Sequence, residues 1–172
     1  GIVEKQGSRT TSVMGYPVVG CDNDLESLKN RYDYAAITIG QMGSSRIRQT
    51  CFNLLKTLGF SLPVIVSPLA HVSPHARIEE GTMAMHHVIV NAGARIGANC
   101  ILNTRSLIEH DAQIGKHTHI STAAIVNGQA MVGSGSFVGS NTTIVQGVCL
   151  PDGYYFRAGH LVTSPEDGQL IK

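Results

Sequence analysis

The sequence has little charge, no tryptophan and no long apolar run. Its 172 residues include 13 Lys and Arg and 12 Asp and Glu, giving a formal net charge of +1. Because no run of Lys or Arg is available to neutralise phosphates, we expect no nucleic-acid partner. No apolar stretch approaches the roughly 20 residues of a membrane-spanning helix, so we expect no membrane insertion. No signal-peptide pattern opens the chain, which favours a cytoplasmic protein.

Cysteine is also sparse. The four cysteines, Cys21, Cys51, Cys100 and Cys149, are widely spaced and form no CxxC pair. This spacing indicates reduced thiols rather than a disulfide framework. Glycine, in contrast, is abundant with 19 residues, and the apolar fraction of 42% excludes a disordered chain.

An aliphatic residue recurs at every sixth position from Val66 to Val162, and only Ala84 and Phe156 depart from Val, Ile or Leu. A second series of mostly small residues stands two positions before these members. The aliphatic series is Val66, Val72, Ile78, Ala84, Val90, Ile96, Leu102, Ile108, Ile114, Ile120, Val126, Val132, Val138, Ile144, Leu150, Phe156 and Val162. A repeat of this kind is a signature of fold.

A period of six fits neither an α-helix nor a plain alternating strand. It predicts a short strand followed by a tight corner, with three such units closing a triangular coil whose aliphatic residues point inward. Coils would stack roughly 4.8 Å apart through parallel β hydrogen bonds. We therefore predict a mainly β fold, a parallel β-helix of between five and six coils over residues 63–163, followed by a C-terminal tail over 164–172.

The first part of the chain, residues 1–62, is predicted to be a small α/β, Rossmann-like domain with a parallel sheet. We expect this domain to be incomplete, because no glycine-rich strand–turn–helix precedes Gly1. The expected elements are a strand ending at Glu4, an extended piece at 16–20, a helix over 25–30 capped by Asp24, a buried strand over 34–39 ending at Gly40, and a second helix capped by Ser44 or Ser45. That second helix should bury Ile47, Cys51, Leu54, Leu55 and Leu58, with Gly59 just past its end.

Most of the eight histidines are expected to be solvated residues at or near corners, and His160 takes a normally small inward position. His110 differs because Asp111 follows it at a corner, in a segment rich in polar residues. A carboxylate bonded to one imidazole nitrogen orients the ring and raises its basicity. From the residues alone, a catalytic pair and a solvated corner both stay open.

The six-residue repeat resembles that of the hexapeptide-repeat acyltransferases. The segments 101–111 and 115–121 resemble the active-site stretch of the NeuD/PglD-type bacterial sugar acetyltransferases, and segments 15–25 and 36–40 resemble their N-terminal domain. The resemblance implies a left-handed β-helix, acetyl-CoA as cosubstrate, and a homotrimer with the acyl-CoA groove between adjacent prisms. It also implies direct acetyl transfer to an amino sugar on a nucleotide carrier, in the biosynthesis of bacterial surface glycans, with no metal required.

The same resemblance implies roles for individual residues. His110 matches the general base, Asp111 the acidic residue beside it, and His119 a contact to the thioester oxygen of acetyl-CoA. Asn103 matches an asparagine near the acceptor. Gly128, Ser140 and Ala158 match positions along the pantetheine groove, and Gly40 matches a residue at the nucleotide-sugar site. Glu4 and Lys5 align with a pair of acidic residues that holds the nucleotide in relatives. Lys5 departs from that pattern because it is basic.

Three other functions stay open at this stage. An O-acetyltransferase acting on sialic acid or another sugar would share the same base. A zinc-dependent carbonic anhydrase uses the same prism, but it needs three histidines on one metal, and His117 and His119 are two positions apart, which is not the expected spacing. A non-catalytic β-helix scaffold is the third alternative.

Overall fold

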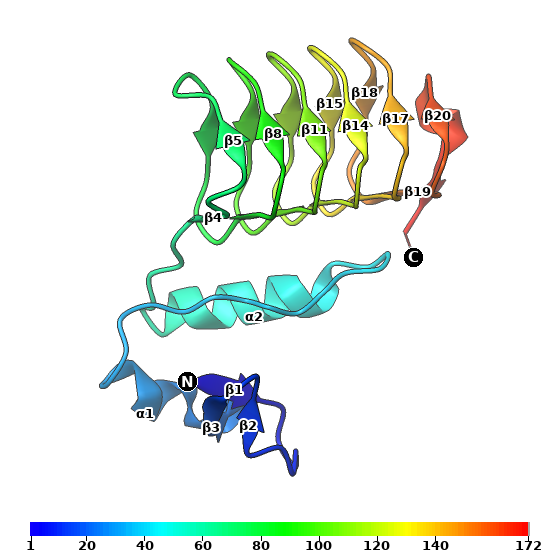
Figure 1. Ribbon diagram of the computed structural model, residues 1–172. Helices are drawn as coiled ribbons and strands as arrows, with labels where there is room; N and C mark the ends of the chain where they lie inside the picture. Colours follow the sequence, from blue (N-terminus) through cyan, green and yellow to red (C-terminus); the bar gives the residue numbers. More distant parts are fainter. Residues whose placement is uncertain (172) are drawn as a thin grey trace.

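The computed structural model describes residues 1–171, so residue 172 of the expected C-terminal tail lies outside the described residues. Three parts follow one another in space (Figure 1). A three-sided prism of short strands lies on one side of the helix α2, Arg46–Thr57, and a small three-stranded sheet lies on the other side. The prism carries most of the residues that the sequence singled out.

The three sides of the prism are sheets of seven, six and five strands, and each turn of the chain adds one strand to each sheet. The seven-stranded sheet contains β4 (Ile65–Val66), β7 (Met83–Ala84), β10 (Ile101–Leu102), β13 (His119–Ile120), β16 (Phe137–Val138), β19 (Tyr154–Phe156) and β21 (Gln169–Leu170). The six-stranded sheet contains β5 (His71–Val72), β8 (Ile89–Val90), β11 (Leu107–Ile108), β14 (Ile125–Val126), β17 (Thr143–Ile144) and β20 (Leu161–Val162). The five-stranded sheet contains β6 (Arg77–Ile78), β9 (Arg95–Ile96), β12 (Gln113–Ile114), β15 (Met131–Val132) and β18 (Cys149–Leu150).

Apart from β21, the stacked strands pair in parallel with identical register, as in Ile101 with His119 and Leu102 with Ile120. The aliphatic series fills the interior, because every member from Ala84 to Val162 is at most 4% exposed. The prediction of a left-handed parallel β-helix is confirmed. Its core is a single column of side chains, so each coil depends on its neighbours for burial.

The second series packs beside the corners and includes buried hydroxyls that bond to the next coil. Thr82 Oγ1 donates to the carbonyl of Gly97 at 2.8 Å, and Thr118 Oγ1 donates to that of Gly133 at 3.0 Å. These bonds satisfy hydroxyls that would otherwise be costly to bury. His160 was expected to take an inward position of this series, but it is exposed, because the last coil has no further coil stacked beyond it.

The small sheet consists of β1 (Ile2–Glu4), β2 (Ser12–Val13) and β3 (Tyr16–Cys21). Strands β1 and β3 pair in parallel, but β2 and β3 form an antiparallel hairpin, so the expected parallel sheet is mixed. A 3-10 turn, η1 (Asp22–Asp24), then leads into the helix α1 (Leu25–Lys29). Asp24 precedes α1 as expected, but its carboxylate accepts a hydrogen bond from the backbone N–H of Cys21 at 2.8 Å instead of capping the helix.

The buried strand predicted over residues 34–39 is wrong. Only an isolated bridge between Tyr34 and Ser61 forms there, and the chain then runs in an irregular path alongside α2 to residue 43 (Figure 1). Within residues 1–171, no strand pairs with this segment to extend a ladder. The carbonyls of Ile37 and Ile39 instead accept hydrogen bonds from the Arg48 guanidinium, which satisfies the backbone by other means.

The helix α2 was predicted correctly, and its buried face in part: Leu55 is buried as expected, and Cys51 and Leu58 are partly buried against the same cluster. Arg48, Phe52 and Leu55 are buried, whereas Ile47 is 67% and Leu54 is 41% exposed. The inner face also includes Arg48, whose guanidinium donates to the carbonyls of Ile37 and Ile39. Ser45 precedes the helix without a capping side-chain bond, and the following turn ends at Gly59 with a φ of +82°.

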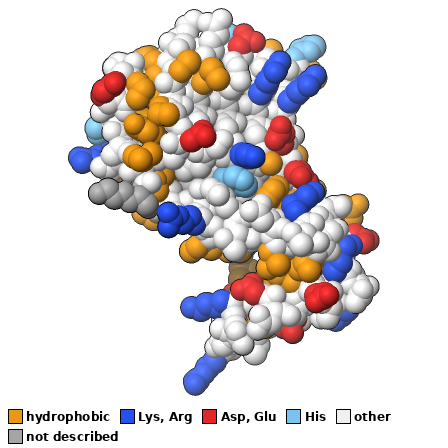
Figure 2. All heavy atoms as spheres, turned by 180° about the vertical axis from the view of Figure 1, so that it is seen from behind, with side chains coloured by type: hydrophobic (Ala, Val, Ile, Leu, Met, Phe, Trp, Pro, Cys, Tyr) orange, Lys and Arg blue, Asp and Glu red, His pale blue; other side chains and the backbone are white. Residues whose placement is uncertain are grey.

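The chain ends with the 3-10 turn η2 (Pro165–Asp167) and with β21, which pairs antiparallel with β19. No helix within residues 1–171 is long and apolar enough to cross a membrane. Seen from behind, positive and negative side chains are interspersed over the surface rather than gathered in one large patch of a single sign (Figure 2).

Candidate active site

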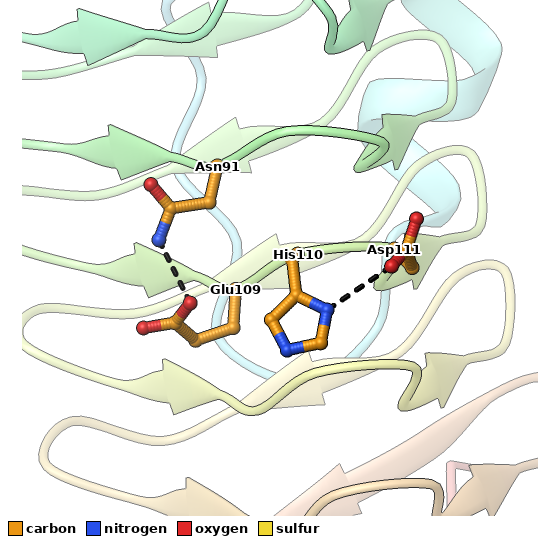
Figure 3. Close-up of polar contacts among 4 residues, drawn as sticks. All are labelled: Asn91, Glu109, His110 and Asp111. Atoms are coloured by element: carbon orange, nitrogen blue, oxygen red, sulfur yellow. Dashed lines mark hydrogen bonds and ion pairs between the residues drawn. The ribbon is translucent and has the colours of Figure 1, made fainter.

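His110 lies at the edge where the six-stranded sheet meets the five-stranded sheet, at the corner between β11 and β12. Its Nδ1 is 3.0 Å from Oδ2 of Asp111, and both side chains are exposed (Figure 3). Asp111 has a left-handed backbone, with a φ of 60°. The stacked Gly93 makes room for this turn, because a Cβ there would lie 2.1 Å from Oδ1 of Asp111.

The other ring nitrogen of His110 lies over a glycine. A Cβ at Gly128 would be 2.6 Å from Nε2, so any side chain there would cover this nitrogen or displace the ring. A carboxylate only accepts hydrogen bonds, which places the proton of the neutral ring on Nδ1 and leaves a lone pair on Nε2. The pair therefore presents an oriented base at an open surface, the arrangement that general-base catalysis requires.

Glu109 lies on the other side of this corner. Its Oε2 accepts a hydrogen bond from Asn91 Nδ2 at 2.8 Å, on the preceding coil. Figure 3 shows the Glu109 side chain turned toward Asn91 and away from Asp111. Asp111, and not Glu109, is therefore the carboxylate that orients the imidazole.

His119 occupies a different environment, on the outer face of the seven-stranded sheet beneath segment 37–43. It is 7% exposed, and its ring meets Phe137 edge to face with centroids 5.2 Å apart. Its Nδ1 is 2.8 Å from the carbonyl oxygen of Gln41, and its Nε2 is 3.2 Å from Nδ2 of Asn103. Burial lowers the pKa of His119 below its ordinary value. The hydrogen bond to the Gln41 carbonyl opposes this shift, and the nearby Arg48 charge adds a smaller lowering.

The pantetheine-groove candidates Ser140 and Ala158 lie one coil apart, at the corner between the seven- and six-stranded sheets, where Asn103 also lies. The Ser140 hydroxyl is 3.0 Å from that of Ser121, and its carbonyl accepts a bond from the N–H of Gly159. Gly128 instead belongs to the His110 corner.

The predicted residues thus form two groups on the two edges of the six-stranded sheet. The first edge carries His110, Asp111 and Gly128, and the second carries Asn103, Ser140 and Ala158, with His119 beside them. Between them, the outer face of this sheet presents Ile89, Leu107 and Ile125, which are partly or well exposed. One prism does not bring the two groups together, since a full strand separates them.

The nucleotide-site candidates are also divided. Gly40 is exposed, has no atom within 4 Å of a Cβ built on it, and directly precedes Gln41. Glu4 ends β1, and Lys5 follows it, on the small sheet beyond α2 (Figure 1). The structure therefore places Gly40 beside the His119 group and leaves Glu4 and Lys5 apart from both groups.

Two buried residues near the second group were given no role by sequence reasoning, although the helix that carries Arg46 and Arg48 resembles the N-terminal domain of the family. Gln41 is 3% and Arg48 is 1% exposed. The Arg48 guanidinium donates to the carbonyl of Ile39 at 2.8 Å and to Oδ1 of Asn99 at 2.8 Å, joining α2, segment 37–43 and the prism. No spacing in the sequence reveals this, because an arginine in an amphipathic helix ordinarily faces solvent.

The cysteines take no part in either group. Cys100 is fully buried in the second series, and burial raises the pKa of its thiol to about 12, which makes it a poor nucleophile. Among residues 1–171, no three His, Cys, Asp or Glu side chains gather as metal ligands would. Two surface grooves, of about 490 and 570 Å³, lie along the five-stranded sheet and beside the start of α2, and neither is lined by His110 or His119.

Comparison with solved structures shows close relatives, although no protein-family model matches the chain. PerB from Caulobacter crescentus, in complex with CoA and GDP-perosamine, is 32% identical with a TM-score of 0.84, covering 90% of this chain and 74% of that one. The acetyltransferase domain of PglB from Neisseria gonorrhoeae is 30% identical with a TM-score of 0.85, covering 95% and 84%. A second structure of that domain holds acetyl coenzyme A and has a TM-score of 0.87.

These likenesses cover 90% and 95% of this chain, so they extend over the N-terminal part as well as the prism. They agree with the family that the sequence resemblance indicated. The chain belongs to the hexapeptide-repeat sugar acetyltransferases of the NeuD/PglD type, which are acyltransferases that use acetyl-CoA.

Proposed function

We propose that this enzyme transfers the acetyl group of acetyl-CoA to the amino group of a nucleotide-linked amino sugar, in the cytoplasm, for surface-glycan biosynthesis. The observation that carries the mechanism is the His110–Asp111 pair, with Nδ1 held at 3.0 Å and Nε2 free above Gly128. The relatives support the substrate class, because PerB was solved with CoA and GDP-perosamine and a related structure is described as a perosamine N-acetyltransferase.

In the proposed reaction, the amino group of the sugar meets Nε2 of His110. As the amino nitrogen of the sugar attacks the thioester carbon, His110 accepts a proton from that nitrogen. The carbonyl electrons move to oxygen and form a tetrahedral oxyanion. Collapse of this intermediate breaks the carbon–sulfur bond, and the CoA thiolate leaves and recovers the proton. Asp111 stabilises the imidazolium that exists between these steps, because the carboxylate already accepts its Nδ1–H.

We propose that the working enzyme is a homotrimer. A closed threefold ring with the six-stranded sheets facing its axis would cover Ile89, Leu107 and Ile125. It would also bring the His110 edge of each prism against the Asn103 edge of the next. This arrangement explains why the two groups lie on opposite edges of one sheet.

Within that assembly, the pantetheine arm of acetyl-CoA would run between Gly128 of one prism and Ser140 and Ala158 of the next. Gly40 would line the nucleotide-sugar site, since the space above it is open. Glu4 and Lys5 would contact the nucleotide end, farthest from the acetyl group. These assignments follow the family pattern and the division of the residues between the two edges.

A substrate panel tests this function. CoA release would be measured with acetyl-CoA and UDP- or GDP-linked 4-amino sugars, the corresponding free amino sugars, and free sialic acids, with and without a metal chelator. We expect turnover with a nucleotide-linked amino sugar, an alkali-stable amide product, and no effect of the chelator. An alkali-labile ester formed on sialic acid would refute the amine acceptor, and bound acetyl-CoA without transfer to any acceptor would favour the scaffold.

A further inference from the structure

We propose that the side-chain amide of Asn103, and not His119, donates the hydrogen bond to the thioester oxygen, and that His119 and Gln41 are positioning residues for this amide. The inference rests on the proposed acetyl transfer and changes the role that the family resemblance implies for His119. It follows from which atoms in this cluster still have a hydrogen to donate.

The first step concerns the tautomer of His119. Its Nδ1 lies 2.8 Å from the carbonyl oxygen of Gln41, and this oxygen can only accept. Nδ1 therefore carries the proton. In a neutral imidazole, Nε2 then has a lone pair and no hydrogen.

The second step concerns the orientation of the Asn103 amide. Its Oδ1 accepts a hydrogen bond from the backbone N–H of Thr104 at 2.8 Å, which fixes which end of the amide is the oxygen. The NH₂ end then points to His119, with Nδ2 at 3.2 Å from Nε2. An amide nitrogen only donates, so this contact independently requires Nε2 to be the acceptor.

The third step is that the ring stays neutral. His119 is buried under segment 37–43, and its ring edge faces Phe137. Its pKa is lowered because burial, with a smaller effect of the Arg48 charge, outweighs the opposing hydrogen bond to the Gln41 carbonyl. Both nitrogens of the neutral ring are used inside the protein, so His119 has no N–H left for a ligand.

Asn103 does have an N–H that a ligand could accept. It is half-buried, and the second hydrogen of its amide has no acceptor among residues 1–171. The residue lies on the edge that carries Ser140 and Ala158, where the pantetheine arm is proposed to run. A donor with fixed orientation at this edge fits the negative charge that develops on a thioester oxygen.

Gln41 holds the other end of this chain of bonds. Its Nε2 donates to the carbonyl of Gly43 at 3.2 Å and to that of Ser136 at 3.3 Å, so the side chain fastens its own segment to the prism. The backbone carbonyl of the same residue is thereby held against His119. Gln41 positions His119, and His119 positions Asn103.

The tautomer is tested first, without substrates. Nitrogen-15 NMR of histidine-labelled enzyme, with His119→Gln to assign the signal, should show a neutral ring protonated at Nδ1 at pH 7–8. In Gln41→Ala, the Nδ1 hydrogen bond should weaken and the signal should move toward that of a solvated histidine. A ring protonated at Nε2, or a charged ring, would overturn the inference.

The donor is tested next, with acetyl-CoA alone. Infrared difference spectra of acetyl-CoA carrying a ¹³C-labelled thioester carbonyl should show a lower stretching frequency on binding to the wild type. Asn103→Ala and Asn103→Asp should lose this shift while retaining acetyl-CoA affinity, and Asn53→Ala on α2 serves as the control. A shift that survives in both Asn103 variants refutes the donor, as does bound acetyl-CoA that shows no shift in the wild type.

Kinetics with the acceptor complete the test. Asn103→Ala and Asn103→Asp should lower kcat by about 10²–10³-fold, the usual loss for one oxyanion donor, with little change in the KM for acetyl-CoA. Unchanged kcat would overturn the proposal. The infrared arm needs no acceptor, so a wrong acceptor leaves its result intact, whereas failure to bind acetyl-CoA would refute the proposed function itself.

Discussion

Two histidines in this protein have their Nδ1 atoms bonded to oxygen, with opposite consequences. At His110 the partner is the Asp111 carboxylate and the ring is exposed, so Nε2 is open to a ligand, as the proposed general base requires. At His119 the ring is buried beside a neutral carbonyl, and burial lowers its pKa although the hydrogen bond to that carbonyl acts in the opposite direction. The residue type is the same, and burial and partner charge decide the role.

Replacing His110 should separate catalysis from binding. We expect His110→Ala to lower kcat by about 10²–10⁴-fold, because a general base is lost. Calorimetric affinity for acetyl-CoA should stay close to that of the wild type. His75→Ala, another exposed histidine near a corner, is the matched control and should keep full activity. Near-normal kcat in His110→Ala would refute the base.

Burial of His119 should make stability depend on pH. The folded-state pKa lies below the ordinary value of about 6.5, so the unfolded chain binds more protons in this range and acid favours unfolding. Urea-unfolding free energy should fall as pH drops below about 6.5, by at most about 1.4 kcal/mol per pH unit from this residue. His119→Gln should have a smaller slope between pH 7 and 5. An identical slope would contradict a buried neutral ring.

At the scale of elements, each prism strand contributes one outward and one inward side chain, and stability comes from stacking the inward ones. Ile114 is 3% exposed, while its neighbour Gln113 faces outward. Ile114→Asp would bury a carboxylate without a partner and should destabilise the fold by several kcal/mol. Gln113→Asp, the matched control one position away, should change the melting temperature little. Equal effects of the two substitutions would show that the inward register is wrong.

The helix α2 depends on a buried cation. Arg48 has no carboxylate partner but donates to several carbonyl oxygens, and burial lowers the pKa of its guanidinium. Arg48→Met should leave those oxygens unpaired and destabilise the protein by about 2–4 kcal/mol. The exposed Arg46→Met is the control and should change stability by less than about 0.5 kcal/mol. Urea titration followed by circular dichroism measures both, and equal midpoints would contradict this account of α2.

At the scale of the whole molecule, the sequence predicts the prism far better than the N-terminal part. The six-residue period is repeated over many coils, so each inward position is supported by its neighbours. Segment 34–39 has no such repetition, and its apolar composition indicated a strand where the chain instead lies irregularly against α2. The carbonyls of Ile37 and Ile39 accept hydrogen bonds from Arg48, a tertiary contact that no local pattern encodes.

The candidate site shows the same division. The neighbouring residues His110 and Asp111 could be recognised from a local motif, and the structure places them in contact. The distribution of the other predicted site residues between the two edges of the six-stranded sheet follows from the 18-residue length of a coil, which fixes the corner at which each position lies. The role of Gln41 could not be predicted from the sequence, because Gln41 contacts His119 although the two residues are 78 positions apart in the chain.

The central claim is that each active site combines the His110 edge of one chain with the Asn103 edge of the next. Light scattering should first give the mass of a trimer for the wild type, for His110→Ala and for Asn103→Ala. The two inactive variants are then unfolded, mixed in equal amounts and refolded together. Random mixing should restore about a quarter of the wild-type sites, because an intact site needs one unmodified edge from each of two neighbours. Mixed trimers without recovered activity would contradict the account.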